Sequence, residues 1–228
     1  MVSCLLPTFS AKQTRLNGQS YYLDPHGNRF PSVSTILNAT RPAEQREALM
    51  RWRQRVGDDE ASRISSTASR RGTGTHKQIE RYLKGHTIDC PETVRPYWES
   101  LQTVLPAIAE VRLVEGFVFH TDLGYAGKAD CVASYEGVPC LCEWKTADRP
   151  KASLEYLNDY PLQVAAYWGA VNECYQSYGI ELNHAVLVVA IPEMPAQVFW
   201  FDQDAIADYW QQWETRVHRF WRRLGGRF

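Results

Sequence analysis

The stretch ADCVASYEGVPCLCEWK, residues 129–145, decides the fold, because it predicts two apolar strands joined by a tight turn. Glu136 and Gly137 form a two-residue loop of the kind that closes a β-hairpin. In that register Asp130 lies directly opposite Glu143, whereas a three-residue loop would change the pairing. Two carboxylates are therefore expected to face each other within otherwise apolar strands.

Like charges on facing positions destabilise a strand pair unless something compensates them. A divalent cation compensates both, and carboxylate oxygens suit Mg²⁺ or Mn²⁺. Strand alternation puts Lys145 on the face of Glu143 and Lys128 on the face of Asp130. Lys145 can then orient or help deprotonate an attacking water and offset charge on a phosphate. The alternative is a buried network of two acids and two lysines, whose burial is costly, so we favour a metal site.

A second segment, GTGTHKQIE at residues 72–80, predicts a glycine-rich entry into a helix that continues to about Lys84. His76 and Glu80 are spaced to share one face of that helix. Taken alone, they suggest a capped or core histidine and a surface acid. Beside the two facing carboxylates, His76 becomes a candidate metal ligand, which favours Mn²⁺ over Mg²⁺. Glu80 becomes a candidate for a second metal or for a contact through water.

The remaining sequence predicts helices first, then a run of strands, then further helices and strands. The expected strands are residues 111–120, 124–135, 138–147, 184–191 and 197–201, and a small hairpin is expected at 20–30. The expected helices begin at PSVSTIL, with Ser32 or Ser34 as cap, and cover 43–69 with a break near Gly57, then 92–109, 160–178 and 203–224. The last carries an apolar stripe of Trp210, Trp213, Val217, Phe220 and Leu224. This order predicts a mixed α/β fold with a central sheet.

The composition is that of an ordinary globular chain. Its 228 residues suit one mid-sized domain, and no apolar run approaches the length of a membrane span. The first residues lack the basic segment of a secretory signal. The six cysteines are Cys4, Cys90, Cys131, Cys140, Cys142 and Cys174, and none forms a CxxC pair, so a zinc site is not indicated. Cys140 and Cys142 lie two apart on one face of an expected strand and are expected to be core residues, which fits a reducing compartment.

The net charge of −1 carries no global sign of nucleic-acid binding, but the arginines are clustered. Residues 41–71 are rich in arginine, and five more follow near the C-terminus: Arg216, Arg219, Arg222, Arg223 and Arg227. Such clusters fit phosphate contacts and solvated helix faces equally well.

At these residues the chain resembles a known superfamily. Asp130, followed after twelve residues by Glu143-Trp144-Lys145, is similar to the D…(D/E)xK core of the PD-(D/E)XK nucleases. His76 resembles the extra histidine of their RecB-like branch, and the segment from Gln163 to Tyr167 resembles that branch's QxxxY motif. Further blocks between about residues 30 and 224 resemble the subfamily of mitochondrial genome maintenance exonucleases and their bacterial homologues.

The resemblance implies a PD-(D/E)XK (restriction-endonuclease-like) core, with a central mixed β-sheet flanked by helices and an N-terminal helical segment. It implies one nuclease domain over residues 1–228, with a mostly helical DNA-guiding part at about 20–110 and the catalytic sheet and C-terminal helices at 111–228. The implied activity is metal-dependent degradation of single-stranded DNA, mainly from the 5′ end, as the strand threads a channel past the metal. No membrane partner is implied.

The same resemblance implies roles for individual residues. Asp130, Glu143, the Trp144 carbonyl and His76 would bind Mg²⁺ or Mn²⁺, and Lys145 would be the catalytic lysine; Gln163 and Tyr167 would support the site or contact DNA, and Thr146 would contact a phosphate. Glu115 matches a glutamate of the family, and the alternative is that it is simply a charged residue at the edge of a strand. No iron–sulfur cluster is expected, because no cysteine follows Cys174.

Two other functions stay open at this point. One is a structure-specific or restriction-type endonuclease on duplex DNA. The other is a non-catalytic nucleic-acid-binding subunit, against which the complete set of Asp130, Glu143 and Lys145 argues. Because no long N-terminal extension precedes the matched blocks, a bacterial or phage-type cytoplasm is expected rather than a mitochondrion.

Overall fold

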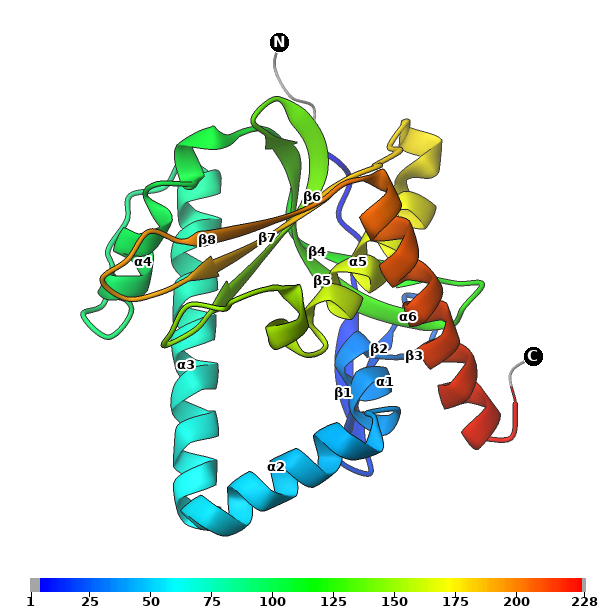
Figure 1. Cartoon of the computed structure of the whole chain (residues 1–228). Helices are drawn as coiled ribbons and strands as arrows, with labels where there is room; N and C mark the ends of the chain where they lie inside the picture. The colour runs from blue at the N-terminus through cyan, green and yellow to red at the C-terminus, as the bar shows by residue number, and fades with distance from the viewer. Residues whose placement is uncertain (1–4, 227–228) are drawn as a thin grey trace.

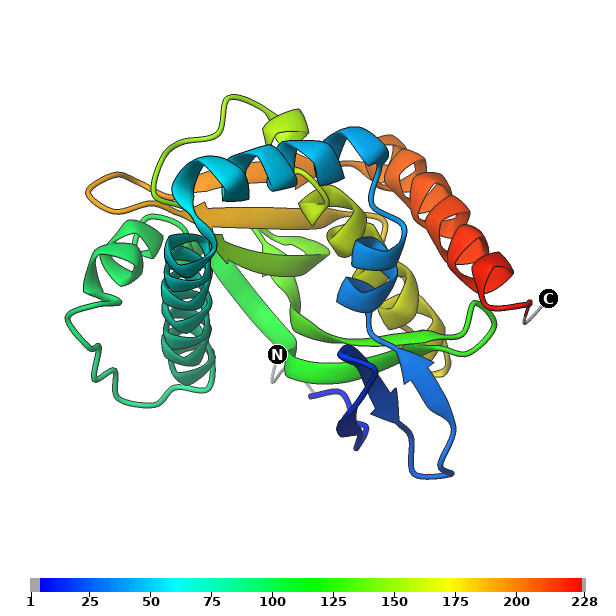
Figure 2. The same ribbon diagram turned by 90° about the horizontal axis from the view of Figure 1, so that it is seen from below.

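A twisted sheet runs through the middle of the molecule with helices packed on both of its faces (Figures 1 and 2). The computed structural model describes residues 5–226. Cys4 and Arg227, named above among the cysteines and arginines, lie outside the described residues. Within residues 5–226, no helix has both the length and the apolar character needed to cross a membrane.

The central sheet has five strands in the order β4-β5-β6-β7-β8. β4, β5 and β6 form an antiparallel meander, β7 runs parallel to β6, and β8 runs antiparallel to β7. Parallel neighbours need a long crossover, which the segment containing α5 supplies between β6 and β7. The strands are β4 (Ile108–His120), β5 (Tyr125–Tyr135), β6 (Val138–Thr146), β7 (Ala185–Ala190) and β8 (Gln197–Phe201). The predicted mixed α/β fold with a central sheet flanked by helices is confirmed.

The hairpin between β5 and β6 has the predicted register. Tyr135 pairs with Val138, and Glu136 and Gly137 both take the positive φ angles that a two-residue hairpin turn of this hand requires, 50° and 83°. From the turn the ladder continues as far as the pair of Cys131 and Cys142, and Asp130 and Glu143 are the next residues along the two strands. The strand pair that carries the facing carboxylates is therefore established by the turn chemistry of the sequence.

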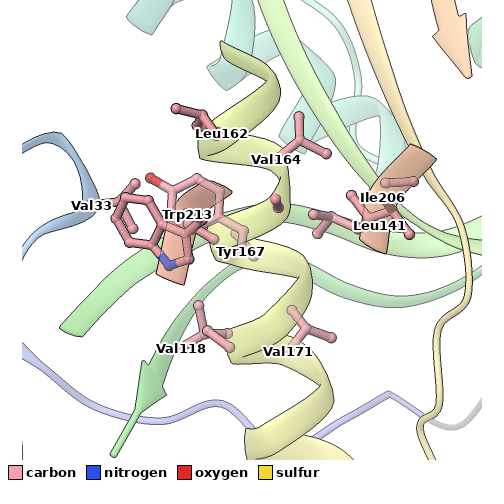
Figure 3. Close-up of a cluster of buried hydrophobic side chains, with 14 of the residues drawn as sticks. Val33, Val118, Leu141, Leu162, Val164, Tyr167, Val171, Ile206 and Trp213 are labelled. Atoms are coloured by element: carbon pink, nitrogen blue, oxygen red, sulfur yellow. The ribbon is translucent and has the colours of Figure 1, made fainter. Parts of the chain in front are cut away.

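Two hydrophobic cores lie on opposite faces of the sheet, as strand alternation requires. One contains Leu141 and Val132 and packs on α1, α5 and α6, with Trp213 beside α5 (Figure 3). The other contains Cys140 and Cys142, which are fully buried against α3 and α4. The helices are α1 (Val33–Ala39), α3 (Asp58–Leu83), α4 (Arg95–Leu101), α5 (Tyr160–Tyr175) and α6 (Gln203–Arg223).

A three-stranded sheet and α1 precede these layers. Its strands are β1 (Lys12–Leu16), β2 (Gln19–Leu23) and β3 (Arg29–Pro31), all antiparallel. The predicted hairpin at 20–30 corresponds to β2 and β3, whereas the sequence analysis missed β1. Ser32 caps α1, because its hydroxyl accepts a hydrogen bond from the Thr35 amide at 3.1 Å.

The prediction of a glycine-rich entry into a helix at residues 72–80 was wrong. α2 (Ala43–Val56) ends at Gly57 as predicted, and α3 then runs without interruption through Gly72 and Gly74. A Cβ at Gly74 would lie 2.6 Å from Cγ2 of Val94, so the glycine allows close packing of this segment on the helix. Tertiary contact here outweighs the weak helix propensity of glycine.

Two other boundaries also differ from the prediction. The helix expected at 92–109 is only α4 followed by the short 3₁₀ turn η1 (Leu105–Ala107), because β4 already begins at Ile108. In the apolar stripe of α6, Trp213, Val217 and Phe220 are buried, but Leu224 is 58% exposed beyond the end of the helix. The remaining 3₁₀ turns, η2 (Leu154–Leu157) and η3 (Gln176–Tyr178), flank α5.

Candidate active site

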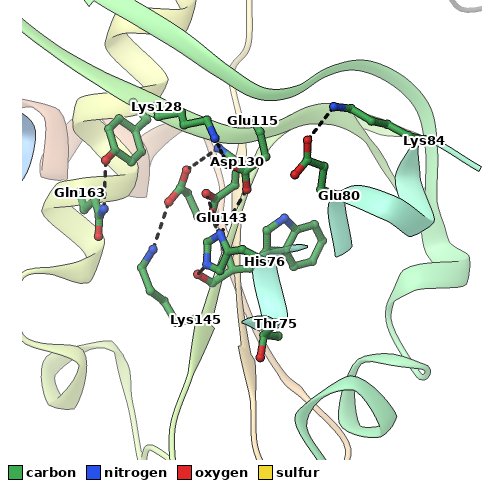
Figure 4. A network of polar contacts seen from close by, with 12 residues as sticks. Thr75, His76, Glu80, Lys84, Glu115, Lys128, Asp130, Glu143, Lys145 and Gln163 are labelled. Carbon is green, nitrogen blue, oxygen red and sulfur yellow. Dashed lines mark hydrogen bonds and ion pairs between the residues drawn. The ribbon is translucent and has the colours of Figure 1, made fainter. Parts of the chain in front are cut away.

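Three carboxylates form a row across three neighbouring strands (Figure 4). Asp130 on β5 has Glu115 of β4 on one side and Glu143 of β6 on the other, since the registers of both ladders bring these positions opposite each other. The β4–β5 ladder pairs the residues on either side of Asp130 and skips Asp130 itself, whereas the β5–β6 ladder ends at the neighbouring Cys131. Such a row of like charges destabilises the sheet unless cations compensate it.

Beyond the end of the β5–β6 ladder, the carboxylates accept hydrogen bonds from backbone amides. The Asp130 amide donates to Oε1 of Glu143 at 3.1 Å, and the Trp144 amide donates to Oδ2 of Asp130 at 2.9 Å. Asp130 is 7% exposed and Glu143 is fully buried. These bonds hold both side chains in fixed positions at the point where β5 and β6 stop pairing.

Glu115 reaches the row through an unusual backbone conformation. Its φ of 53° lies in the left-handed region, which a non-glycine residue in a strand rarely adopts. Its carboxylate pairs with Nζ of Lys128 at 2.6 Å and approaches His76. Conformations of this kind concentrate at functional sites, and this one brings a third acid to Asp130.

Helix α3 contributes His76. Its Nδ1 atom lies 3.2 Å from Oδ1 of Asp130 and 3.3 Å from Oε1 of Glu115, and its Nε2 atom lies 3.0 Å from the Trp144 carbonyl oxygen. One imidazole ring thus joins α3 to three strands. The predicted meeting of His76 with Asp130 and the Trp144 carbonyl is present in the structure.

Lys145 closes the other side of the row. Its Nζ atom lies 3.2 Å from Oε2 of Glu143, and its side chain is 13% exposed. The same atom lies 5.5 Å from the centroid of the Tyr160 ring, at the start of α5. A positive charge is therefore held between an apolar ring and the buried carboxylate.

The charges in the row shift one another's pKa values. Burial lowers the pKa of His76, but the carboxylates of Asp130 and Glu115 outweigh it and raise the pKa to about 10. Burial and the charge of Asp130 raise the pKa of Glu143 to about 8, against the opposing effect of Lys145. Burial acts to raise the pKa of Asp130, but His76 and Lys145 hold it below its usual value. Perturbed groups gathered in this way are typical of functional sites.

The donor set suits a divalent cation. Ligand atoms of His76, Glu115 and Asp130 all lie within 4.8 Å of one another, and one imidazole with two carboxylates matches the preferences of Mn²⁺ and tolerates Mg²⁺. Binding there would require His76 to release the proton that its neighbours now stabilise. Glu143 lies outside this group, and its carboxylate accepts hydrogen bonds from the Asp130 amide and from Lys145. Its role as a ligand, like that of the Trp144 carbonyl, stays a prediction.

The other candidates lie around this centre. Glu80 pairs with Lys84 at 2.7 Å and does not belong to the three-donor group. Gln163 donates to the hydroxyl of Tyr167 at 3.1 Å, and the Tyr167 ring covers Gly127 of β5. Their roles, and that of Thr146, stay predictions.

The sequence analysis missed the residues that brace α3 against the end of β6. Arg71 lies one to two turns before His76 and donates to Oγ1 of Thr146 at 3.3 Å. Its guanidinium also lies 4.7 Å from the centroid of the Tyr97 ring and pairs with Asp148, which accepts a bond from the Tyr97 hydroxyl at 2.8 Å. The sequence signal was present only as one arginine among many in residues 41–71.

Comparison with known proteins gives three similar chains, each named mitochondrial genome maintenance exonuclease 1. The mouse protein (Mus musculus) is 35% identical over 201 residues, which cover 85% of this chain and 59% of the relative. The Xenopus tropicalis protein is 34% identical, covering 84% and 57%, and the human protein is 32% identical, covering 85% and 58%. This chain thus spans less than two thirds of the length of each relative. No protein-family model matches it.

The expectation of a bacterial or phage-type cytoplasmic location is contradicted. All three relatives are named as mitochondrial proteins. The expectation depended on the lack of a long N-terminal extension. Since the match spans 57–59% of the relatives' length, the start of this chain carries no weight on location.

Proposed function

We propose that this protein is a metal-dependent DNA exonuclease of the PD-(D/E)XK type that hydrolyses phosphodiester bonds in single-stranded DNA, mainly from the 5′ end. The observation that carries the proposal is the row of Glu115, Asp130 and Glu143 between His76 and Lys145. The exonuclease names of the relatives support the same reaction class.

In this proposal His76, Glu115 and Asp130 hold one Mg²⁺ or Mn²⁺ ion, and no iron–sulfur cluster takes part. Such an ion supplies an activated water and stabilises charge on the phosphate and its leaving oxygen. The strands hold the two carboxylates rigidly, and α3 delivers the imidazole. Trp144 contributes its carbonyl oxygen, which already lies beside the His76 ring.

Lys145 acts on the reacting phosphate as a cation. Burial lowers its pKa, but Glu143 and Asp130 outweigh burial and raise the pKa above the ordinary value. A lysine that keeps its proton donates hydrogen bonds, so it orients the attacking water and offsets negative charge that develops on the phosphate. Glu143 positions the ammonium group through their contact at 3.2 Å.

We further propose that residues 20–110 guide the DNA strand and residues 111–228 hold the catalytic sheet. α2 and α3 meet at Gly57 in a corner that extends away from the sheet (Figure 1). The exposed arginines of α2 suit a phosphate backbone, because such contacts are independent of base sequence. From the relatives' names we take the proposal that the protein acts in the maintenance of a mitochondrial genome.

The test uses linear single-stranded DNA labelled at either end, with Mg²⁺, Mn²⁺ or EDTA. We expect metal-dependent shortening from the 5′ end, and a loss of at least roughly a hundredfold in rate for Lys145→Ala. A Lys84→Ala variant, which removes an exposed lysine outside the site, should keep the wild-type rate. Shortening from the 3′ end would overturn the polarity alone. Absence of cleavage with either metal would overturn the proposal that the protein is a nuclease.

A circular single-stranded substrate distinguishes the proposed exonuclease from the endonuclease alternative. A strict exonuclease leaves the circle intact, whereas an endonuclease linearises it. Binding of DNA without any hydrolysis would instead support a non-catalytic subunit.

A further inference from the structure

A cavity of about 510 Å³ lies between α1, α2 and the first turn of α5. We propose that it is a subsite that holds one nucleotide of the strand next to the phosphate being hydrolysed. This proposal rests on the proposed function, because it assigns the place of the substrate beside the same catalytic centre.

The cavity adjoins the catalytic centre through two of its lining residues. Tyr160 forms part of its wall, and the ring of Tyr160 lies 5.5 Å from Nζ of Lys145. Gln163, one turn further along α5, also lines it and bonds to Tyr167. A nucleotide in the cavity would therefore have Lys145 as its neighbour across the tyrosine ring.

The lining offers the three surfaces that a nucleotide needs. Tyr160 and Leu49 are 37% and 39% exposed, and with Leu37 they give an apolar wall for the face of a base. Asn38 and Gln45 place carboxamides at its rim. A site with an aromatic face, amides and a cation is typical of nucleotide binding rather than of a purely apolar ligand.

Arg41 supplies the cation. It donates one hydrogen bond to Oδ1 of Asn38 at 2.6 Å, and a guanidinium has five N–H donors, so donors remain for a phosphate. Asp159 also lines the cavity, but Arg216 pairs with it at 3.3 Å and offsets its charge. The net field at the rim therefore favours an anion.

The same lining predicts tolerance of base sequence. A carboxamide presents both a donor and an acceptor, so Asn38, Gln45 and Gln163 can each meet any of the four bases. Stacking on Tyr160 is likewise independent of the base. An exonuclease must accept every base in turn, and stacking and carboxamide contacts of this kind allow that.

The experiment measures binding by fluorescence anisotropy in EDTA, so that no hydrolysis occurs. A short single-stranded oligonucleotide is compared with a series in which one nucleotide at a time is abasic. For the wild-type protein we expect one position at which base removal weakens binding roughly tenfold. Tyr160→Ala should weaken binding of the intact strand by a similar factor and lose sensitivity at that position only.

Two matched variants control for indirect effects. Tyr160→Phe keeps the ring and should restore the sensitivity to base removal that Tyr160→Ala loses. Tyr156→Ala should bind as the wild type does, since Tyr156 is 65% exposed in the preceding turn and is not among the residues that line the cavity. Arg41→Gln should flatten the salt dependence of binding, because one phosphate contact is lost.

If the effects of Tyr160→Ala and of base removal on binding are additive at every position, the proposal that the cavity is a nucleotide subsite is overturned. If the wild type still shortens DNA in the presence of metal, that result leaves the proposed function intact. Failure of the wild-type protein both to bind and to cleave single-stranded DNA would overturn the two proposals together.

Discussion

His76 Nδ1 lies 3.2 Å from Asp130 Oδ1, and this contact joins the long helix α3 to the middle of the sheet. The same ring reaches the Trp144 carbonyl with its other nitrogen. The candidate metal ligand is thus also a structural link between two layers of the fold. The protonation of His76 and the stability of the metal-free protein are coupled for that reason.

The metal-free protein should lose stability as pH rises above 6.5. The pKa of His76 is raised from 6.5 to about 10, and that of Glu143 from 4.5 to about 8, so the folded state binds more protons than the unfolded state over this range. The His76 contribution is fully present below pH 6.5 and is lost as pH rises through 10; that of Glu143 is present below pH 4.5 and is lost through pH 8. Urea unfolding in EDTA across this range measures the decline.

A His76→Gln variant is the control for this pH dependence. Its free energy of unfolding should fall less steeply than that of the wild type between pH 6.5 and 10, because the histidine proton is gone. Parallel curves for the two proteins would show that His76 is not held protonated by its neighbours.

The pair of Glu143 and Lys145 should behave as one unit in stability. Their side chains are 0% and 13% exposed, and removal of one member of a buried ion pair costs about 3–5 kcal/mol. Above pH 8, where Glu143 with its pKa of about 8 is ionised and Lys145 keeps its proton, we expect Glu143→Gln and Lys145→Met each to destabilise the protein by about 3 kcal/mol, and the double variant by less than the sum. Chemical denaturation of the four proteins gives the coupling energy; strictly additive losses would mean that the pair is not energetically linked.

Arg71 should contribute more to stability than its place in an arginine-rich helix suggests. Arg71→Met removes the contacts to Tyr97, Thr146 and Asp148, for an expected loss of about 1–2 kcal/mol. Arg63→Met is the matched control, because Arg63 pairs with Glu60 of the same helix at the surface, and it should cost below about 0.5 kcal/mol. Equal losses of stability for the two variants in thermal or urea unfolding would show that Arg71 does not hold α3 against the end of β6.

Gly127→Ala should disturb the support of the site through Tyr167. The added Cβ would lie 2.2 Å from Cε1 of the Tyr167 ring, so the ring must move and the bond to Gln163 is strained. The expected loss of stability is about 1–3 kcal/mol. In a Tyr167→Ala background the same substitution should cost much less, and an undiminished cost would show that the clash lies elsewhere.

The sequence predicts the hairpin of β5 and β6 because the information there is local. Glu136-Gly137 specifies the turn, the turn specifies the register, and the register brings Asp130 opposite Glu143 with Lys145 beside it. The contact of His76 with this row is a tertiary contact; the helix spacing of His76 considered beside the two facing carboxylates, and the resemblance to a known superfamily, both pointed to it.

The place of Glu115 could not be predicted from pattern alone. It depends on a left-handed φ within β4 and on a register shift between Ala109 and Leu113, and the single glycine that follows Glu115, Gly116, does not by itself specify either feature. The continuous course of α3 through its glycines was also missed, because packing against Val94 rather than local propensity decides it.

The most direct test of the account is a calorimetric titration of the metal-free protein with Mn²⁺. We predict binding of one ion by the wild type and a loss of at least roughly tenfold in affinity for His76→Gln, Glu115→Gln and Asp130→Asn. Glu92→Gln, which removes an exposed carboxylate outside the site, should bind as the wild type does. Wild-type affinity in His76→Gln and Glu115→Gln, or no binding by the wild type, would contradict the three-donor metal site.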